Sequence, residues 1–145
     1  MNIAKILTPR ATTALLHASD TVRQGLEIMR RHGYTAIPVL DEDEKYIGSV
    51  TEGDFLRHMM EIGSTDLQKQ EKYYIYQILR KEFCKPLGIM ADERQVIDSV
   101  LRQNYVPIVD DRGCLCGIVT RRSVIAYLAG KETQCPEQDK GLDEA

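Results

Sequence analysis

Two short segments of the sequence contain residue types that can hold a phosphorylated sugar. They are residues 48–54 (G-S-V-T-E-G-D) and 117–123 (G-I-V-T-R-R-S), and each has a glycine three positions before a threonine. A threonine at the start of a helix can hydrogen-bond a phosphate, because free backbone N–H groups and partial positive charge gather there. Asp54 can accept hydrogen bonds from both hydroxyls of a ribose, whereas Arg121 and Arg122 can donate in pairs to phosphate oxygens. The chemistry of phosphate and sugar binding is thus divided unequally between the segments.

A purely structural role for the same residues is the alternative. Thr51 and Thr120 could cap the helices that follow them, which stabilises a helix by about 1 kcal/mol without any ligand. Arg121 and Arg122 could form a solvated first turn. Cations at a helix N-terminus oppose the helix dipole, however, so their placement favours a nearby anion.

The two segments belong to a longer internal repeat. Alignment of Pro38 with Pro107 superposes the two glycine–threonine segments without a gap and puts Ser123 at the position of Asp54. Each copy has an apolar run around its proline, an acidic turn, a second apolar run and then helical spacing. This pattern predicts strand, turn, strand and helix, with the threonine where the second strand ends. The predicted strands are residues 37–40 and 46–50 in the first copy, and 106–109 and 114–119 in the second.

An amphipathic helix precedes each predicted hairpin, and another follows it. We expect Ser19 or Asp20 to cap the first preceding helix and Asp92 to cap the second. The two copies also begin alike, with Ile-Leu ahead of a proline at residues 6–7 and 78–79. Helical spacing predicts these buried faces: Val22, Leu26 and Met29; Phe55, Leu56, Met59 and Met60; Val96, Ile97, Val100 and Leu101; Val124, Ile125 and Leu128.

Composition argues against several classes of protein. The chain has 145 residues, 43% of them hydrophobic, and a net charge of −3, which suits a small globular protein without a global attraction to nucleic acid or anionic lipid. No apolar run reaches the roughly 20 residues of a membrane span, and the N-terminus lacks the apolar stretch of a secretion signal. The four cysteines form no paired C-x-x-C set. We therefore expect a cytoplasmic protein with reduced cysteines and without a metal site.

Enzyme signatures are absent from the sequence. It contains no G-x-S-x-G elbow, no H-E-x-x-H helix and no Walker lysine loop. Asp54 and Thr51 could act as base and nucleophile, but no third residue is evident that would orient them. The sequence therefore predicts a protein that is not an enzyme.

The motif G-x-x-[ST]-x-x-[DN] is complete at residues 48–54 and has Ser123 in its last place at residues 117–123. Two such copies in register, each following a proline-bearing strand, resemble a pair of cystathionine-β-synthase-type (CBS) repeats, also called a Bateman module. The resemblance covers residues 3–128 and extends to stand-alone CBS pairs that bind cyclic di-AMP or AMP. It implies an α/β (α+β) fold in which two repeats of helix-strand-helix-strand-strand-helix pack about a pseudo-twofold axis. The expected division is repeat 1 at 3–60, a linker at 61–77, repeat 2 at 78–128 and a flexible tail at 129–145.

The resemblance implies two ligand clefts, each built from both repeats. The first would hold the adenine beside Tyr34 and the phosphate beside the two arginines, while Ser123 replaces the usual ribose carboxylate. Its expected lining is Thr12 and Ala14 of the entry segment, then Tyr34, Thr35, Ala36, Ile37, Thr120, Arg121 and Arg122. This cleft should be the main one.

The second cleft would have the ribose carboxylate but an acidic neighbour. Glu52 stands where the first cleft has Arg121 and should repel phosphate. We expect this cleft to be empty or to bind a nucleoside-like group weakly. Its expected lining is Tyr105, Val106 and Pro107 with Gly48, Thr51 and Asp54.

The predicted function is that of a regulatory module whose ligand is an adenine nucleotide: AMP, ATP or ADP, or cyclic di-AMP. We expect a homodimer that signals to a protein target, since the repeats themselves carry no effector. The alternative is an interaction or dimerisation adaptor without a working nucleotide site. Tyr73, Tyr74 and Tyr76 in the linker could contact a second copy, but packing against the repeats is expected.

Overall fold

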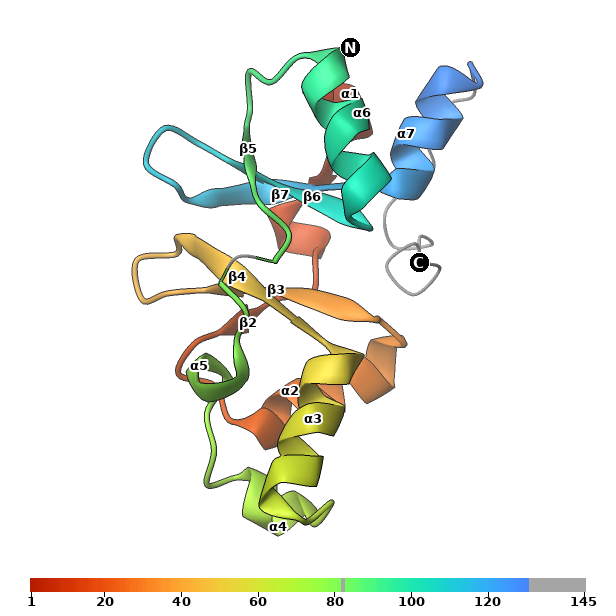
Figure 1. Ribbon diagram of the computed structural model, residues 1–145. Coiled ribbons are helices and arrows are strands. Elements are labelled where there is room, and N and C mark those ends of the chain that lie inside the picture. Colours follow the sequence, from red (N-terminus) through yellow and green to blue (C-terminus); the bar gives the residue numbers. More distant parts are fainter. Residues whose placement is uncertain (82, 131–145) are drawn as a thin grey trace.

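The computed structural model describes residues 1–81 and 83–130, and its two β-sheets stack face to face with helices on their outer sides (Figure 1). The first sheet has the order β2-β3-β4, with β2 at Leu16–His17, β3 at Ala36–Leu40 and β4 at Tyr46–Thr51. The second has the order β1-β7-β6-β5, with β1 at Thr8–Pro9, β7 at Leu115–Thr120, β6 at Tyr105–Val109 and β5 at Leu87–Gly88. These layers confirm the predicted fold class.

The longer helices each cover one sheet. Helices α2 (Val22–His32) and α3 (Glu52–Ile62) lie outside the first sheet, and α1 (Ile3–Ile6), α6 (Glu93–Arg102) and α7 (Arg121–Leu128) lie outside the second (Figure 1). The short η1 (Arg10–Thr12) leads from β1 of the second sheet to β2 of the first, and α4 (Leu67–Gln70) and α5 (Ile75–Ile78) follow α3 beside the first repeat. All but the first two residues of the predicted tail lie outside the described residues.

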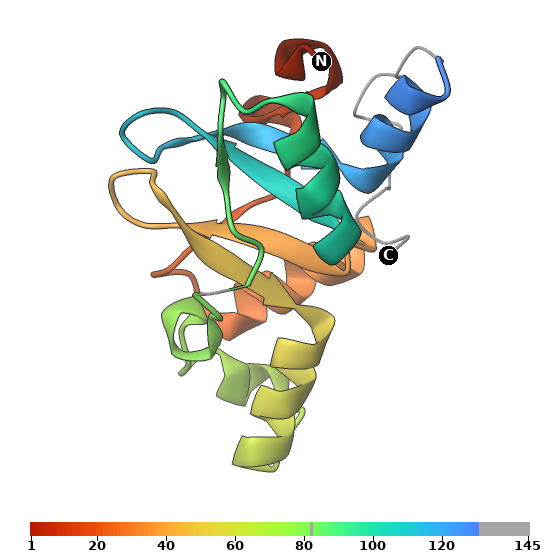
Figure 2. The same ribbon diagram turned by 45° about the horizontal axis from the view of Figure 1, so that its top comes forward.

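The turns of the two hairpins meet at one end of the molecule (Figure 2). The Tyr46 N–H donates to the Gly113 carbonyl at 3.0 Å, and the Leu115 N–H donates to the Glu44 carbonyl at 3.3 Å. These are equivalent bonds in the repeat alignment, so a pseudo-twofold axis passes between the turns. Strands β4 and β7 both run away from this end, and helices α3 and α7 begin at the other.

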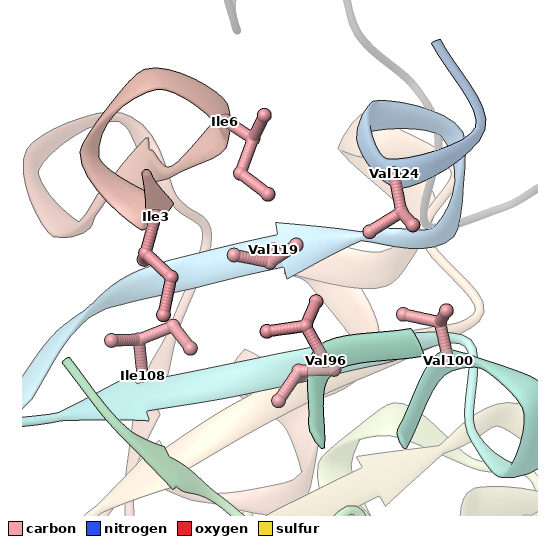
Figure 3. Packing of buried hydrophobic residues seen from close by; sticks show 8 residues of the cluster. Ile3, Ile6, Val96, Val100, Ile108, Val119 and Val124 are labelled. Carbon is pink, nitrogen blue, oxygen red and sulfur yellow. The ribbon is translucent and has the colours of Figure 1, made fainter. Parts of the chain in front are cut away.

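The repeats exchange their first segments. Strand β1 pairs with β7 of the second repeat, Thr8 opposite Ile118, and Ile3 and Ile6 lie in that repeat's core (Figure 3). In return, Arg80 forms a β-bridge with Ser49. The division at residues 3, 61 and 78 thus describes the order along the chain, while in space residues 3–9 lie on the opposite sheet.

The second core is made by this exchange. Figure 3 shows Ile3 and Ile6 facing Val96, Val119 and Val124 across the outer face of the second sheet. The first core has the matching composition: α5 of the predicted linker inserts Ile75, which is fully buried, and Leu79 packs beside it. At about 25 cal/mol per Å² of buried apolar surface, each such side chain adds roughly 1.5–3 kcal/mol to the repeat that receives it.

The helix caps differ in part from the prediction. Asp92 caps α6 as expected, accepting the N–H of Gln95 at 2.9 Å. Helix α2 is capped by Thr21 with Gln24 in a reciprocal capping box, so the prediction of Ser19 or Asp20 is wrong. Asp20 instead accepts the N–H of His17 at 2.8 Å.

Several apolar residues predicted to be buried are exposed. Helical spacing identified the buried side of each helix, but it predicted more buried residues per helix than the structure has. The exposed residues are Leu56 and Met60 on α3, Leu101 on α6, and Ile125 and Leu128 on α7. They leave apolar surface on the outside of the molecule.

Candidate functional site

The two threonines occupy helix N-caps, and their hydroxyls already have partners. Thr51 Oγ1 accepts the N–H of Asp54 at 3.2 Å, and Asp54 Oδ2 accepts the N–H of Thr51 at 2.8 Å. Thr120 Oγ1 accepts the N–H of Ser123 at 3.1 Å and lies 2.8 Å from its hydroxyl. The capping role is therefore realised at both turns, and it leaves each hydroxyl able to make a further bond to a ligand.

The glycines of the two segments give room to the exchanged strands. A Cβ on Gly48, whose φ is +151°, would lie 2.8 Å from the Arg80 carbonyl oxygen. A Cβ on Gly117 would overlap the carbonyl oxygen of Thr8. Gly48 was predicted to line the second cleft, but the Arg80 backbone covers it, so close packing explains the glycine.

A buried chain of hydroxyl groups fills the second cleft. Tyr105 is 0% exposed, and its hydroxyl bonds to that of Ser49. The Tyr46 hydroxyl lies 2.8 Å from Ser49 Oγ and donates to the carbonyl of Cys84 at 2.7 Å. Burial raises the pKa of both phenols, and it raises the pKa of the Cys84 thiol to about 11, so all three groups stay neutral. The ring of Tyr105 thus occupies space between the sheets.

Arg80 binds the carboxylate that was predicted to hold a ribose. Arg80 Nε lies 2.7 Å from Oδ1 of Asp54, and its Nη2 donates to Thr51 Oγ1 at 3.2 Å. Arg57 approaches the same Oδ1 at 3.2 Å. Asp54 is only 2% exposed.

Sequence reasoning missed Arg80 and its cation–π partner Phe83, whose ring centre lies 4.3 Å from the guanidinium carbon. A signal was present, because the likeness of residues 78–79 to residues 6–7 identifies the segment that enters each cleft. Its use required knowing that the segments exchange.

The walls of the first cleft come from both repeats. Ala36 and Tyr34 pack with Ile118 between the sheets, and η1 runs beside β7. Tyr34 also stacks on His32, with ring centres 5.3 Å apart. The carbonyl of Thr35 accepts the N–H of Glu52 at 3.1 Å, which fixes the start of β3 against α3.

Strand alternation removes two predicted side chains from the clefts. Ile37 and Val106 are fully buried in the cores beneath the helices, so only their backbones can face a ligand. Their neighbours Ala36, Tyr105 and Pro107 point the other way. In the entry segment Thr12 is exposed and Ala14 is half-buried.

The two arginines of α7 differ in exposure. Arg121 Nε donates to the Val100 carbonyl at 2.9 Å, near the C-terminal end of α6, so Arg121 ties two helices of its own repeat together. Arg122 is exposed on the first turn of α7. Their shared role at a phosphate stays a prediction.

Each proline ends the parallel pairing of its strand. Strand β2 pairs with β3 only from Val39 onward, and β5 pairs with β6 only from Ile108. Since proline has no N–H to donate, the parallel pairing does not extend to the residues before it. In the second repeat the Gln103 side chain covers the strand edge before Pro107, donating to the carbonyls of Lys85 and Tyr105 at 3.0 and 3.1 Å. Tyr34 occupies the equivalent position in the first repeat.

None of the helices in the part of the chain that the structure describes is long and apolar enough to cross a membrane.

Comparisons with known proteins agree on one family. The CBS domain family matches residues 8–61 and 90–130. The chain is 31% identical over 108 residues to an inosine-5'-monophosphate dehydrogenase of Aquifex aeolicus; the match covers 72% of the chain but only 20% of the dehydrogenase. A second inosine-5'-monophosphate dehydrogenase, from Methanocaldococcus jannaschii, is 26% identical over 107 residues, and the match again covers 20% of the dehydrogenase.

Solved structures share the fold at low identity. The CbpB protein of Listeria monocytogenes in complex with c-di-AMP has a TM-score of 0.78 at 18% identity, and the match covers 90% of this chain and 96% of that one. CBSX2 in complex with AMP has a TM-score of 0.73 at 21% identity, covering 89% and 96%.

Proposed function

The chain belongs to the CBS domain family, and from that premise we propose that it is a non-catalytic regulatory module that binds one adenine nucleotide in the first inter-repeat cleft. The nucleotide is AMP, ATP or ADP, or cyclic di-AMP. Two structures with the same fold were solved with c-di-AMP and with AMP. The inosine-5'-monophosphate dehydrogenases contain much more chain than this match, and none of their catalytic activity is assigned to the present residues.

The observation that carries the proposal is the difference between Ala36 and Tyr105. These residues hold the same position in the two repeats, each opposite the threonine that ends its hairpin. At one site the tyrosine ring fills the space between the sheets and bonds to Ser49. At the other a methyl group takes its place. Ala36 is 3% exposed and packs in one cluster with Tyr105 and Ile118, so we infer only that its small side chain makes the first cleft the easier of the two to open for a ligand.

The residues of the first cleft divide the work of recognition. Tyr34 flanks the adenine ring. The backbone N–H and C=O groups of residues 35–37 hydrogen-bond the edge of the adenine, as they would bond a neighbouring strand. The entry segment with Thr12 and Ala14 forms the opposite wall. Thr120 and Arg122 bind the phosphate at the start of α7, where the helix dipole adds attraction. Arg121 contributes by holding α7 against α6.

Signalling follows from the position of the cleft between the repeats. A ligand that contacts both sheets changes the angle between them and biases a homodimer surface towards or away from a protein target. The dimer surface that we propose is the exposed apolar set on α3 and α7, led by Met60 and Ile125. Free Cys84, Cys114 and Cys116 suit a reducing cytoplasm.

Isothermal titration with AMP and with cyclic di-AMP tests the proposal. We expect one binding site per chain and an affinity that falls about tenfold in Arg122→Ala, the loss of one charge-assisted hydrogen bond. Arg57→Ala is the matched control, because Arg57 is the exposed arginine of the second cleft. Absence of heat and of thermal stabilisation with every adenine nucleotide would favour the adaptor instead.

The dimer surface has its own test. Sedimentation of the Met60→Glu and Ile125→Glu variants should give monomers, since a buried charge in an apolar interface is costly. If both variants remain dimers, the dimer interface does not include Met60 and Ile125.

A further inference from the structure

A groove is lined by residues of the β3–β4 turn and of the segment that begins α5. The turn lies at the end of the first sheet opposite the start of α3 (Figures 1 and 2). The groove has a volume of about 580 Å³. One wall is the β3–β4 turn with Asp41, Glu42 and Asp43, and the other is the start of α5 with Tyr74 and Tyr76. We call this the acidic-aromatic groove.

The two tyrosines are presented to solvent by a hydrogen-bonded backbone. Tyr74 is 41% exposed and Tyr76 59% exposed, with their rings stacked at 5.7 Å and 14°. The N–H of Tyr76 donates to the carbonyl of Ala18 at 3.1 Å, and the N–H of Ile75 donates to that of Asp20 at 2.9 Å. Neighbouring Tyr73 instead packs into the first core. The exposed pair is a preformed aromatic surface, the kind that anchors a binding partner.

The opposite wall supplies fixed negative charge. Asp41 Oδ1 accepts the N–H groups of Asp43 and Lys45 at 2.8 and 3.0 Å, which holds the turn in one shape. Glu42 and Asp43 are exposed. Arg10 and His17 both contact Glu44, at 2.8 and 3.0 Å, and Lys45 at the end of the turn is exposed.

The second repeat provides an internal comparison. Its equivalent turn has Asp110 and Asp111 followed by Arg112, which lies 3.6 Å from Asp110. Lys45 follows the acidic residues of the first turn as Arg112 follows those of the second, but the first turn has four carboxylates, Asp41 to Glu44, against two in the second. Among the described residues no tyrosine pair faces the second turn, so the first turn combines the larger excess of carboxylates with exposed aromatic rings.

We propose that the acidic-aromatic groove docks an arginine-bearing extended segment of a protein partner. A guanidinium plane can stack on the tyrosine rings while its N–H fork bonds to a carboxylate of the turn. The same carboxylates repel nucleic acid and anionic lipid. The volume suits one or two side chains of a peptide. This inference goes beyond nucleotide binding and does not depend on it.

Fluorescence anisotropy with a short labelled peptide of alternating glycine and arginine tests the groove. The probe should bind, and the double variant Tyr74→Ala/Tyr76→Ala should weaken it about tenfold. Glu42→Gln/Asp43→Asn should weaken it similarly. Asp111→Asn is the matched control on the other turn and should leave the affinity unchanged. Circular dichroism melting should show that the tyrosine variant, altered only at exposed rings, is folded.

Three outcomes would overturn the proposal. Equal affinity for a lysine version of the peptide, with no effect of the tyrosine variant, would indicate charge attraction alone. If the arginine peptide does not bind even at low salt, the groove does not dock arginine-bearing segments. Loss of dimers in the tyrosine variant during sedimentation would assign the groove to a second copy. AMP is absent from every arm, so failure here leaves the nucleotide proposal standing.

Discussion

Replacing Gly117 by alanine tests whether the glycine of the second segment serves strand exchange. The new methyl would overlap the Thr8 carbonyl oxygen and lie 3.0 Å from Leu7 Cδ1. The first contact is with backbone, so β1 must shift. Overpacking of this kind costs about 1–3 kcal/mol. Alanine also restricts the unfolded chain more than glycine does, which stabilises the folded state by about 0.4–1 kcal/mol. This gain applies here because φ of Gly117 is not in the left-handed region.

Gly88→Ala is the matched control. It also lies in a short strand of the same sheet, but nothing is within 4 Å of its new Cβ. It should be neutral or more stable by about 0.4–1 kcal/mol. The difference between the two variants then isolates the contact with β1. At an m-value of about 1–3 kcal/mol per molar urea, we expect their unfolding midpoints to differ by roughly 1 M.

Nucleotide affinity adds a second readout to the same pair of variants. Strand β1 leads directly into η1 and the entry segment of the first cleft. Affinity should therefore fall in Gly117→Ala and be unchanged in Gly88→Ala. Equal stability of the two variants would refute the reasoning, because the close approach of β1 would then not require glycine.

Three further changes test other contacts. Tyr105→Phe removes one buried hydrogen bond and should cost about 1 kcal/mol in urea unfolding; equal stability would contradict the hydroxyl chain. Glu44→Gln should remove part of the acid sensitivity of unfolding. The hydrogen bond from His17 lowers the pKa of Glu44 below its ordinary value of 4.5, so this contribution is present above that pH and is lost as pH falls through the lowered pKa. An unchanged stability profile from pH 6 to 3 would count against it. Thr21→Ala should cost about 1 kcal/mol as a lost cap, and Ser19→Ala less than about 0.5 kcal/mol; the reverse order would restore the original cap assignment.

The repeat made the fold predictable from sequence. The register of Pro38 on Pro107 identified both hairpins, because strand period and turn residues are local properties. The threonine caps followed from the same pattern. Helix faces were less predictable: the spacing that marked Phe55 as buried marked Leu56 as well, and which of them is covered depends on how α3 packs against its sheet.

The site was predictable in outline only. Alignment showed that Asp54 and Ser123 are not equivalent in chemistry, and the two clefts do differ in their surroundings. It could not show that Arg80 binds Asp54, because that contact depends on which sheet the entry segment joins. Nor could it show that Tyr105 points between the sheets and fills the second cleft, since the face of a strand is set by packing.

The exchange of first segments has a consequence for how the chain folds during synthesis. Thr8 leaves the ribosome more than a hundred residues before its partner Ile118. Ile3 and Ile6 stay without their packing partners until the second repeat has been synthesised. Closing so long a loop adds little to the entropy cost but raises contact order, which slows folding. The second half could then not be released as an independently folding fragment, because its core includes Ile3 and Ile6, and a deletion near the N-terminus would destabilise the far end of the chain.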